Sequence, residues 1–156
     1  MSHEKLLCTI RDARQFFDRG TACLDESDSA VCPAEGCMNA AQQVAHVAHT
    51  VDWFREGIFS PTGFDMDFEK HAREVMAVTS LGKAREWLGR AFDELFQKLA
   101  ETPWDELQQP IAPGMIMGGE PRHAVGGAIT DHTAHHRGAL SVYARLAGKT
   151  PAMPYL

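Results

Sequence analysis

Apolar side chains recur at every third or fourth position along most of this chain, which is the spacing of one face of an α-helix. The clearest stripe comprises Leu81, Ala84, Leu88, Ala91, Leu95 and Leu99. Alternating runs of β-branched residues, which are typical of strands, are absent. The pattern predicts long helices over residues 2–26, 39–59, 80–102 and 121–148, and a short helix over residues 67–78.

Capping residues and breakers mark the ends of these predicted helices. Ser2 is a natural N-cap, and Asn39 with Gln42 three residues later approximates a capping box. Pro121 suits a first helical turn, and Gly148 suits a helix end. Residues 27–37 form a predicted loop, and residues 104–120, which include several glycines, form a long irregular connection. Connections of that length often shape a functional pocket.

Four long helices joined by connections of mixed length predict an all-α fold. We expect an antiparallel four-helix bundle with one short extra helix and a long irregular connection before the last long helix. The 156 residues, of which 44% are hydrophobic, can bury a core without disulfides. No repeat or linker divides the chain, so we expect residues 1–156 to form a single domain.

The last predicted helix carries a pair of histidines that points to metal binding. His132 and His136 lie one turn apart on a face that continues through Ile129, Leu140 and Tyr143. Both imidazoles are therefore expected to point into the bundle, where unsatisfied ring nitrogens would be costly. An i, i+4 pair can chelate a divalent ion with a third ligand from a facing helix. The alternative is that each imidazole only forms hydrogen bonds to buried partners.

The second predicted helix offers two candidates for the third ligand. His46 lies near the apolar arc of this helix, whereas His49 lies nearer its acidic side, beside Glu56. Burial therefore favours His46 as the inward residue. We expect His49 to support the ligands from outside or to replace His46 as a ligand.

These segments carry a resemblance to a known family. The segment from Asn39 to His46 and the segment from His132 through His136 to Gly138 resemble the ligand segments of DinB-like (YfiT-like) four-helix bundles, over nearly the whole chain. The resemblance implies a divalent metal, commonly zinc or nickel, held by three histidines. The matching positions are His46, His132 and His136.

The other candidate site residues are weaker. Asp131 projects about 100° away from His132, so at most it supports the ligands from outside. Arg137 is a candidate for holding an anionic substrate, and Trp53 and Tyr143 are candidates for lining a substrate pocket. The sequence contains no His-Glu-x-x-His motif, which argues against metalloprotease chemistry of that type.

Three imidazoles leave a metal with a coordination position open to water or substrate, as in catalytic zinc sites. The resemblance implies several activities, among them transfer of low-molecular-weight thiols such as bacillithiol, mycothiol-dependent isomerisation and metal-dependent hydrolysis. Because no carboxylate base accompanies the histidines, our leading hypothesis is a thiol (S-)transferase that acts on an electrophilic small molecule with a thiol cosubstrate. The alternatives are a metal-dependent hydrolase and a non-catalytic metal-binding stress-response protein.

The net charge, the cysteines and the remaining apolar residues indicate which partners and which compartment to expect. The net charge of −6 disfavours nucleic acid and anionic membrane surfaces. No segment has the length of a membrane span and residues 1–5 do not open a signal peptide, so we expect a cytoplasmic protein. Its four cysteines are expected to be free thiols: Cys8, Cys23, Cys32 and Cys37. Phe92, Phe96 and Ile116 exceed what one apolar stripe needs to bury, which predicts a homodimer.

Overall fold

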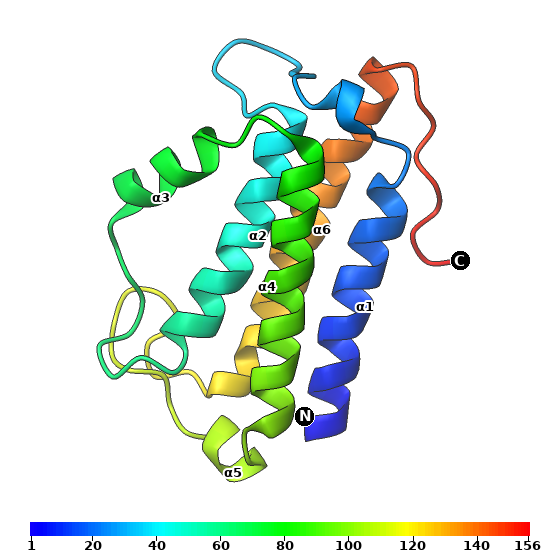
Figure 1. Ribbon diagram of the computed structural model, residues 1–156. Coiled ribbons are helices and arrows are strands. Elements are labelled where there is room, and N and C mark those ends of the chain that lie inside the picture. The colour runs from blue at the N-terminus through cyan, green and yellow to red at the C-terminus, as the bar shows by residue number, and fades with distance from the viewer.

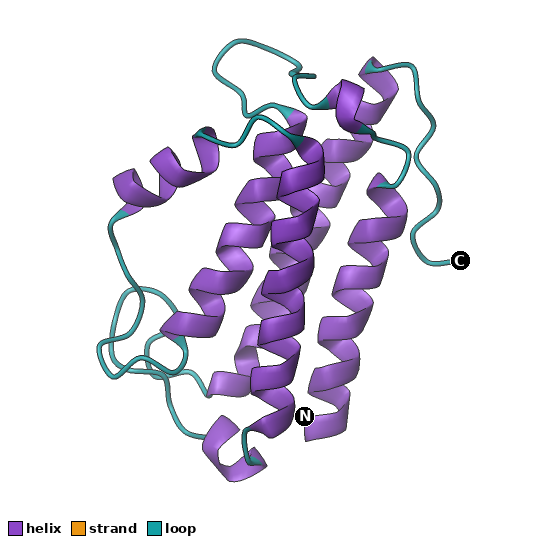
Figure 2. Ribbon diagram, viewed as in Figure 1, coloured by secondary structure: helices purple, strands orange, loops and turns teal.

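The computed structural model, which describes residues 1–156, is all-helical, as predicted (Figures 1 and 2). The long helices are α1 (His3–Thr21), α2 (Ala40–Gly57), α4 (Leu81–Glu101) and α6 (Val125–Leu146). The short ones are α3 (Phe68–Met76), α5 (Trp104–Leu107) and the 3₁₀ helices η1 (Glu26–Asp28) and η2 (Arg122–Ala124). The nearest approach to a sheet is one isolated bridge between Pro110 and Pro121.

The four long helices form a bundle in which α1 and α2 each pack against both α4 and α6. Along the chain they run up, down, down and up in the view of Figure 1, so α2 and α4 are parallel to each other and antiparallel to α1 and α6. The parallel pair requires a crossover along the length of the bundle, which residues 58–80 provide. Helix α3 lies within this crossover and packs against α2, outside the bundle (Figure 1).

Side-chain caps start α1, α2 and α4 where the sequence predicts. The Ser2 side chain accepts a hydrogen bond from the backbone of Lys5, and Ser80 does the same for Lys83 at the start of α4. At the start of α2, Asn39 and Gln42 form a complete capping box, each side chain accepting from the other's backbone N–H over 2.9 Å. These caps satisfy N–H groups that have no partner within the helix.

Two predicted helix ends are wrong. Helix α1 ends at Thr21 instead of residue 26, because Asp25 caps a separate turn, η1, by accepting from Ser27. Helix α6 begins at Val125 instead of Pro121. There the backbone N–H of Arg122 donates to Gln109 over 3.0 Å, which holds this stretch beside residues 109–110 before η2.

The core lies between the long helices and forms one cluster of 30 buried hydrophobic residues. Phe92 is one of the three residues on which the homodimer prediction rests. It is only 1% exposed and belongs to this core. Phe96 and Ile116 are partly buried and pack against it. The apolar side chains that we expected to contact a second chain therefore pack largely within one chain.

Two further expectations concern the cysteines and the membrane. All four cysteines are free thiols, as predicted. None of the helices combines the length and the apolar character needed to cross a bilayer.

Candidate metal centre

The three histidines predicted as ligands lie together between α2 and α6. His46 comes from α2, and His132 and His136 come from successive turns of α6. Their ring centroids lie 4.5 to 5.0 Å apart, and one nitrogen of each ring lies within 4.8 Å of the others. Two helices that are far apart in the sequence therefore bring three imidazoles to one point.

The spacing of these nitrogens fits a metal ion. The Nε2 atoms of His46 and His132 lie 3.3 Å apart. A tetrahedral ion with metal–nitrogen bonds of about 2.0–2.1 Å separates its ligand nitrogens by about 3.3–3.4 Å. The donor set is also suitable, because imidazoles bind zinc, nickel, copper and iron. The residues present thus fit a divalent transition metal.

All three imidazoles favour the neutral form that metal binding requires. Burial, together with the neighbouring imidazoles, lowers the pKa of His132 to about 4 and that of His136 to about 3. Burial also lowers the pKa of His46. At neutral pH the ring lone pairs are therefore free of protons and available to a cation.

A chain of buried hydrogen bonds orients His136. Its Nδ1–H donates to Oε1 of Gln43 over 2.6 Å, Nε2 of Gln43 donates to the Tyr143 hydroxyl over 3.3 Å, and that hydroxyl donates to the backbone oxygen of Met38 over 2.6 Å. A proton on Nδ1 leaves Nε2 of His136 as the atom with a lone pair. Such partners usually fix the tautomer and the ring orientation of a metal-binding histidine.

Gln43 is the residue of this centre that sequence reasoning missed. It lies three residues before His46, so the two share one face of α2. The sequence signal that was available is a glutamine on the same helix face as an inward histidine. In the structure this side chain is only 8% exposed, and buried polar groups of this kind need a hydrogen-bond partner.

A cavity of about 380 Å³ adjoins the histidines, and both His46 and His132 line it. Most of its wall is apolar and comes from α2, α3 and the residues next to them: Met38, Trp53, Phe54, Phe68, Val75 and Met76. No aspartate or glutamate lines it. A small molecule in this space would meet apolar side chains along its body and the imidazoles at one end.

The remaining predicted site residues are dispersed. Trp53 lines the cavity, and its indole N–H donates to the backbone oxygen of Asp65 over 2.7 Å. Tyr143 does not line the cavity; its hydroxyl accepts a hydrogen bond from Gln43, the partner of His136. Asp131 is exposed at the surface of α6.

Arg137 lies away from the cavity. Its guanidinium stacks on the rings of Phe16 and Tyr155 and donates to the Tyr155 hydroxyl over 2.8 Å. It thereby joins α6 to α1 and to the C-terminal segment. The predicted role in holding an anionic substrate does not fit this position, because the side chain faces about 100° away from the neighbouring His136.

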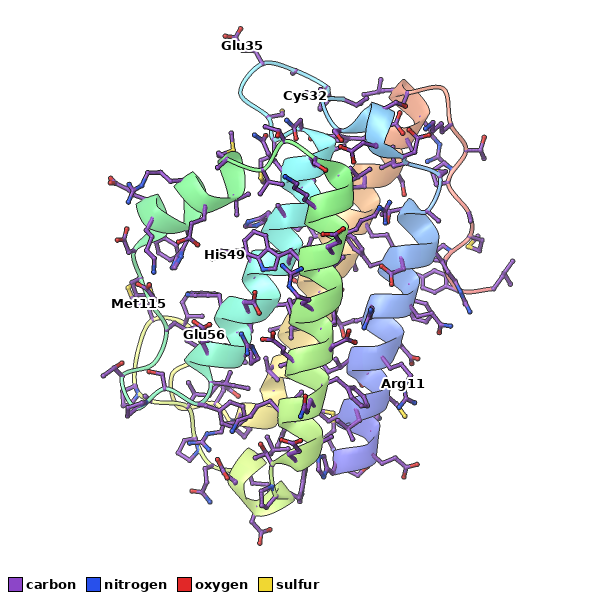
Figure 3. All side chains as sticks on the ribbon, in the orientation of Figure 1. Arg11, Cys32, Glu35, His49, Glu56 and Met115 are labelled. Atoms are coloured by element: carbon purple, nitrogen blue, oxygen red, sulfur yellow. The ribbon has the colours of Figure 1, made fainter.

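His49 lies midway along α2 (Figure 3), and it is not part of the three-histidine cluster. Its ring centroid is 4.7 Å from that of His71, and its Nε2 is 3.6 Å from Oε2 of Glu74. Burial and the neighbouring His71 lower the pKa of His49. His49 therefore belongs to a second cluster of possible ligands, His49, His71 and Glu74.

Comparison with known proteins agrees with the resemblance seen in the sequence. The model of the DinB family matches residues 1–156, the whole chain. None of the curated proteins compared with the chain matches it.

Proposed function

Because the chain belongs to the DinB family, we propose that it is a metal-dependent thiol (S-)transferase that holds one divalent ion through His46, His132 and His136. Zinc or nickel suits these three imidazoles. The thiol is a low-molecular-weight cosubstrate, and the acceptor is an electrophilic small molecule with an apolar body.

The three clustered imidazoles beside a largely apolar cavity carry this proposal. Hydrolysis usually needs a positioned base to take a proton from the attacking water. The two further imidazoles that line the cavity, His49 and His71, belong to a cluster separate from the three proposed ligands. A bound metal would supply Lewis acidity that favours a thiolate over its thiol, so no such base is required. The sulfur then forms a bond to the electrophilic carbon, the leaving group departs with its bonding electron pair, and the thiol proton passes to solvent.

The chain's own residues supply the binding and orientation. His46 and His132 face the cavity, so the reacting sulfur would be held at its imidazole end. The apolar residues along α2 and α3 would hold the body of the acceptor and exclude water from it. Gln43 keeps the ring of His136 in the tautomer that leaves Nε2 free.

Metal analysis of tag-free protein tests the centre first. We expect inductively coupled plasma mass spectrometry to find about one ion per chain fewer in His46→Ala and in His132→Ala than in the wild type. His135→Ala is the matched control, since His135 is exposed on the same helix and is predicted to keep the metal. Equal metal content in all four proteins would reject the three-histidine centre.

Turnover is tested with a generic aryl halide electrophile, several small thiols, and protein with and without metal. We expect electrophile loss that requires both the thiol and the metal. Ester hydrolysis without any thiol would favour a hydrolase instead. Tight metal binding without turnover of either kind would favour the non-catalytic stress-response protein.

A further inference from the structure

A second cluster of metal-binding side chains joins α3 to α2, and the proposed thiol transfer does not use it. His49 is on α2, and His71 and Glu74 are on α3, three residues apart and hence on one face of that helix. One nitrogen or oxygen of each lies within 4.8 Å of the others. The side chains of His49 and His71 are only 12% and 13% exposed, whereas that of Glu74 is 49% exposed.

His71 has the hydrogen-bond pattern of a metal-binding histidine. Its Nε2 lies 3.1 Å from the backbone oxygen of Asp65, which can only accept, so Nε2 carries the proton. Its Nδ1 is then a lone-pair acceptor, and that atom is buried with no hydrogen-bond partner. In metal sites, a ligating histidine usually donates its other N–H to a carbonyl or carboxylate in this way.

Unlike the neighbouring carboxylates, which accept hydrogen bonds from other groups, Glu74 is available to bind an ion. Asp52 accepts from the Trp87 indole over 2.7 Å and from Arg55 over 3.0 Å. Asp65 is likewise engaged, by Lys70 at 3.2 Å and by the backbone N–H of residue 67 at 3.0 Å.

The one ionisable group within 4 Å of the Glu74 carboxylate is the imidazole of His49, whose Nε2 at 3.6 Å lies beyond hydrogen-bond distance. The groups that remain available to bind an ion are therefore two imidazoles and one carboxylate.

We propose that His49, His71 and Glu74 bind a second divalent transition-metal ion, distinct from the one at His46, His132 and His136. Two histidines and one glutamate form a ligand set of known zinc sites, with a fourth position left open. The surrounding surface depression is lined by one cation, Lys70, and by more carboxylates than that: Asp52, Glu56 and Asp65 besides Glu74. This excess of negative charge favours a cation there.

This second ion would fasten α3 onto the bundle. His49 and His71 line the apolar cavity together with other α3 side chains, Phe68, Ala72 and Val75. A bond from each helix to one ion would hold α3 in the position that closes this side of the cavity. The two proposed metal sites share no ligand, so each can be removed by substitution without removing a ligand of the other.

Zinc titration of the metal-stripped full chain, followed by mass spectrometry of the gel-filtered protein, tests the proposal. We expect two ions per wild-type chain, one in Glu74→Gln and His71→Ala, and two in the control Glu69→Gln. Glu69 is also on α3 and 94% exposed, so its variant makes the same charge change outside the cluster. The Glu74 variant alters an exposed group and keeps the test valid if the His71 variant does not fold.

His132→Ala separates this proposal from the main centre. We expect it to keep one zinc, held by the second cluster, and the double variant His132→Ala/Glu74→Gln to keep none. Two zinc ions in Glu74→Gln, or a single ion in the wild type that only His132→Ala removes, would overturn the second site.

Hydrogen exchange supplies a readout of the link between the helices. Zinc should slow amide exchange in residues 68–76 of the wild type at least several-fold and leave it unchanged in Glu74→Gln. Equal effects of zinc in both proteins would overturn the fastening of α3.

Discussion

The ring of His136 is held by a glutamine on another helix, and we expect this contact to determine how well the centre can bind a metal. Gln43 is the single polar side chain that receives its Nδ1–H. The glutamine is itself held by Tyr143, whose hydroxyl is anchored on the backbone of Met38. The orientation of this proposed ligand thus depends on a hydrogen-bonded chain of three residues, none of which is itself a proposed ligand: Gln43, Tyr143 and Met38.

We expect Gln43→Leu to weaken metal affinity by about 10- to 100-fold, because the His136 ring loses its orienting partner. The buried Nδ1–H is then unsatisfied, which should also cost about 1–3 kcal/mol of folding free energy in the metal-free protein. Competition with a chromophoric chelator measures the first effect, and urea unfolding measures the second. Tyr143→Phe leaves the hydrogen bond between Gln43 and His136 in place, so it should weaken metal affinity less than Gln43→Leu does. A larger loss of affinity in Tyr143→Phe would contradict this prediction.

The stability of the metal-free protein should fall as the pH falls. In the folded chain the pKa of His132 is lowered from the ordinary 6.5 to about 4, so between these values the unfolded chain binds more protons than the folded chain. Stability is then lost at up to about 1.4 kcal/mol per pH unit for each such histidine. Unfolding in chelator between pH 7.5 and 4.5 measures this slope. His132→Gln should have a shallower slope, and an identical slope would contradict the prediction.

Part of the site was predictable residue by residue, and the reason is geometric. Helical periodicity shows which side chains share a face, and this placed His46 inward with His132 and His136. Periodicity does not show which side chain on one helix meets which on another. Gln43 and the His49–His71–Glu74 cluster both depend on contacts between helices, so sequence reasoning missed the first and left His49 without its partners.

At the level of helices, two glycines of α6 have opposite roles. A Cβ on Gly126 would lie 2.8 Å from Cδ1 of Leu6, which is fully buried in α1. A Cβ on Gly138 would meet nothing within 4 Å. The first glycine therefore permits the close packing of α6 on α1, and the second only adds backbone freedom to a helix.

We expect Gly126→Ala to lower the free energy of unfolding by about 1–3 kcal/mol, since Leu6 must move within a filled core. Gly138→Ala should raise it by about 0.5–1 kcal/mol, because alanine restricts the unfolded chain and suits a helix interior. Urea unfolding of the two variants beside the wild type provides the comparison. Changes of the same sign in both variants would contradict the packing role of Gly126.

The helix ends that were predicted correctly are those set by local residues. Asn39 and Gln42 cap each other within one turn, and Ser80 caps α4 alone, so neighbouring residues suffice to predict both starts. The wrong ends depend on contacts with distant parts of the chain or on a competing turn. Pro121 stays outside α6 because it pairs with Pro110, which periodicity does not show.

For the whole molecule, the number of long helices was predictable but their directions were not. Each amphipathic stripe shows that a helix has a buried face, and four stripes predict a bundle. Whether consecutive helices run parallel or antiparallel depends on the path of the connection. The crossover at residues 58–80, which carries α3, makes α2 and α4 parallel neighbours (Figure 1).

The homodimer stays a prediction, now carried by Phe96 and Ile116 at the edge of the core, since Phe92 is buried within one chain. Two associated chains should give twice the chain mass of 17.2 kDa in light scattering at micromolar concentration. Phe96→Glu should reduce that mass toward one chain if this face is the contact. A mass of one chain for the wild type would reject the homodimer.

The position of α3 outside the bundle separates the residues that fold the protein from those that shape its cavity. Helix α3 contributes one fully packed side chain to the core, Val75, while several of its other residues line the cavity. Substitutions along this helix can therefore alter the size and shape of the cavity at little cost to folding. The shape of the cavity can thus diverge among descendants of such a protein while the bundle and its three histidines stay unchanged.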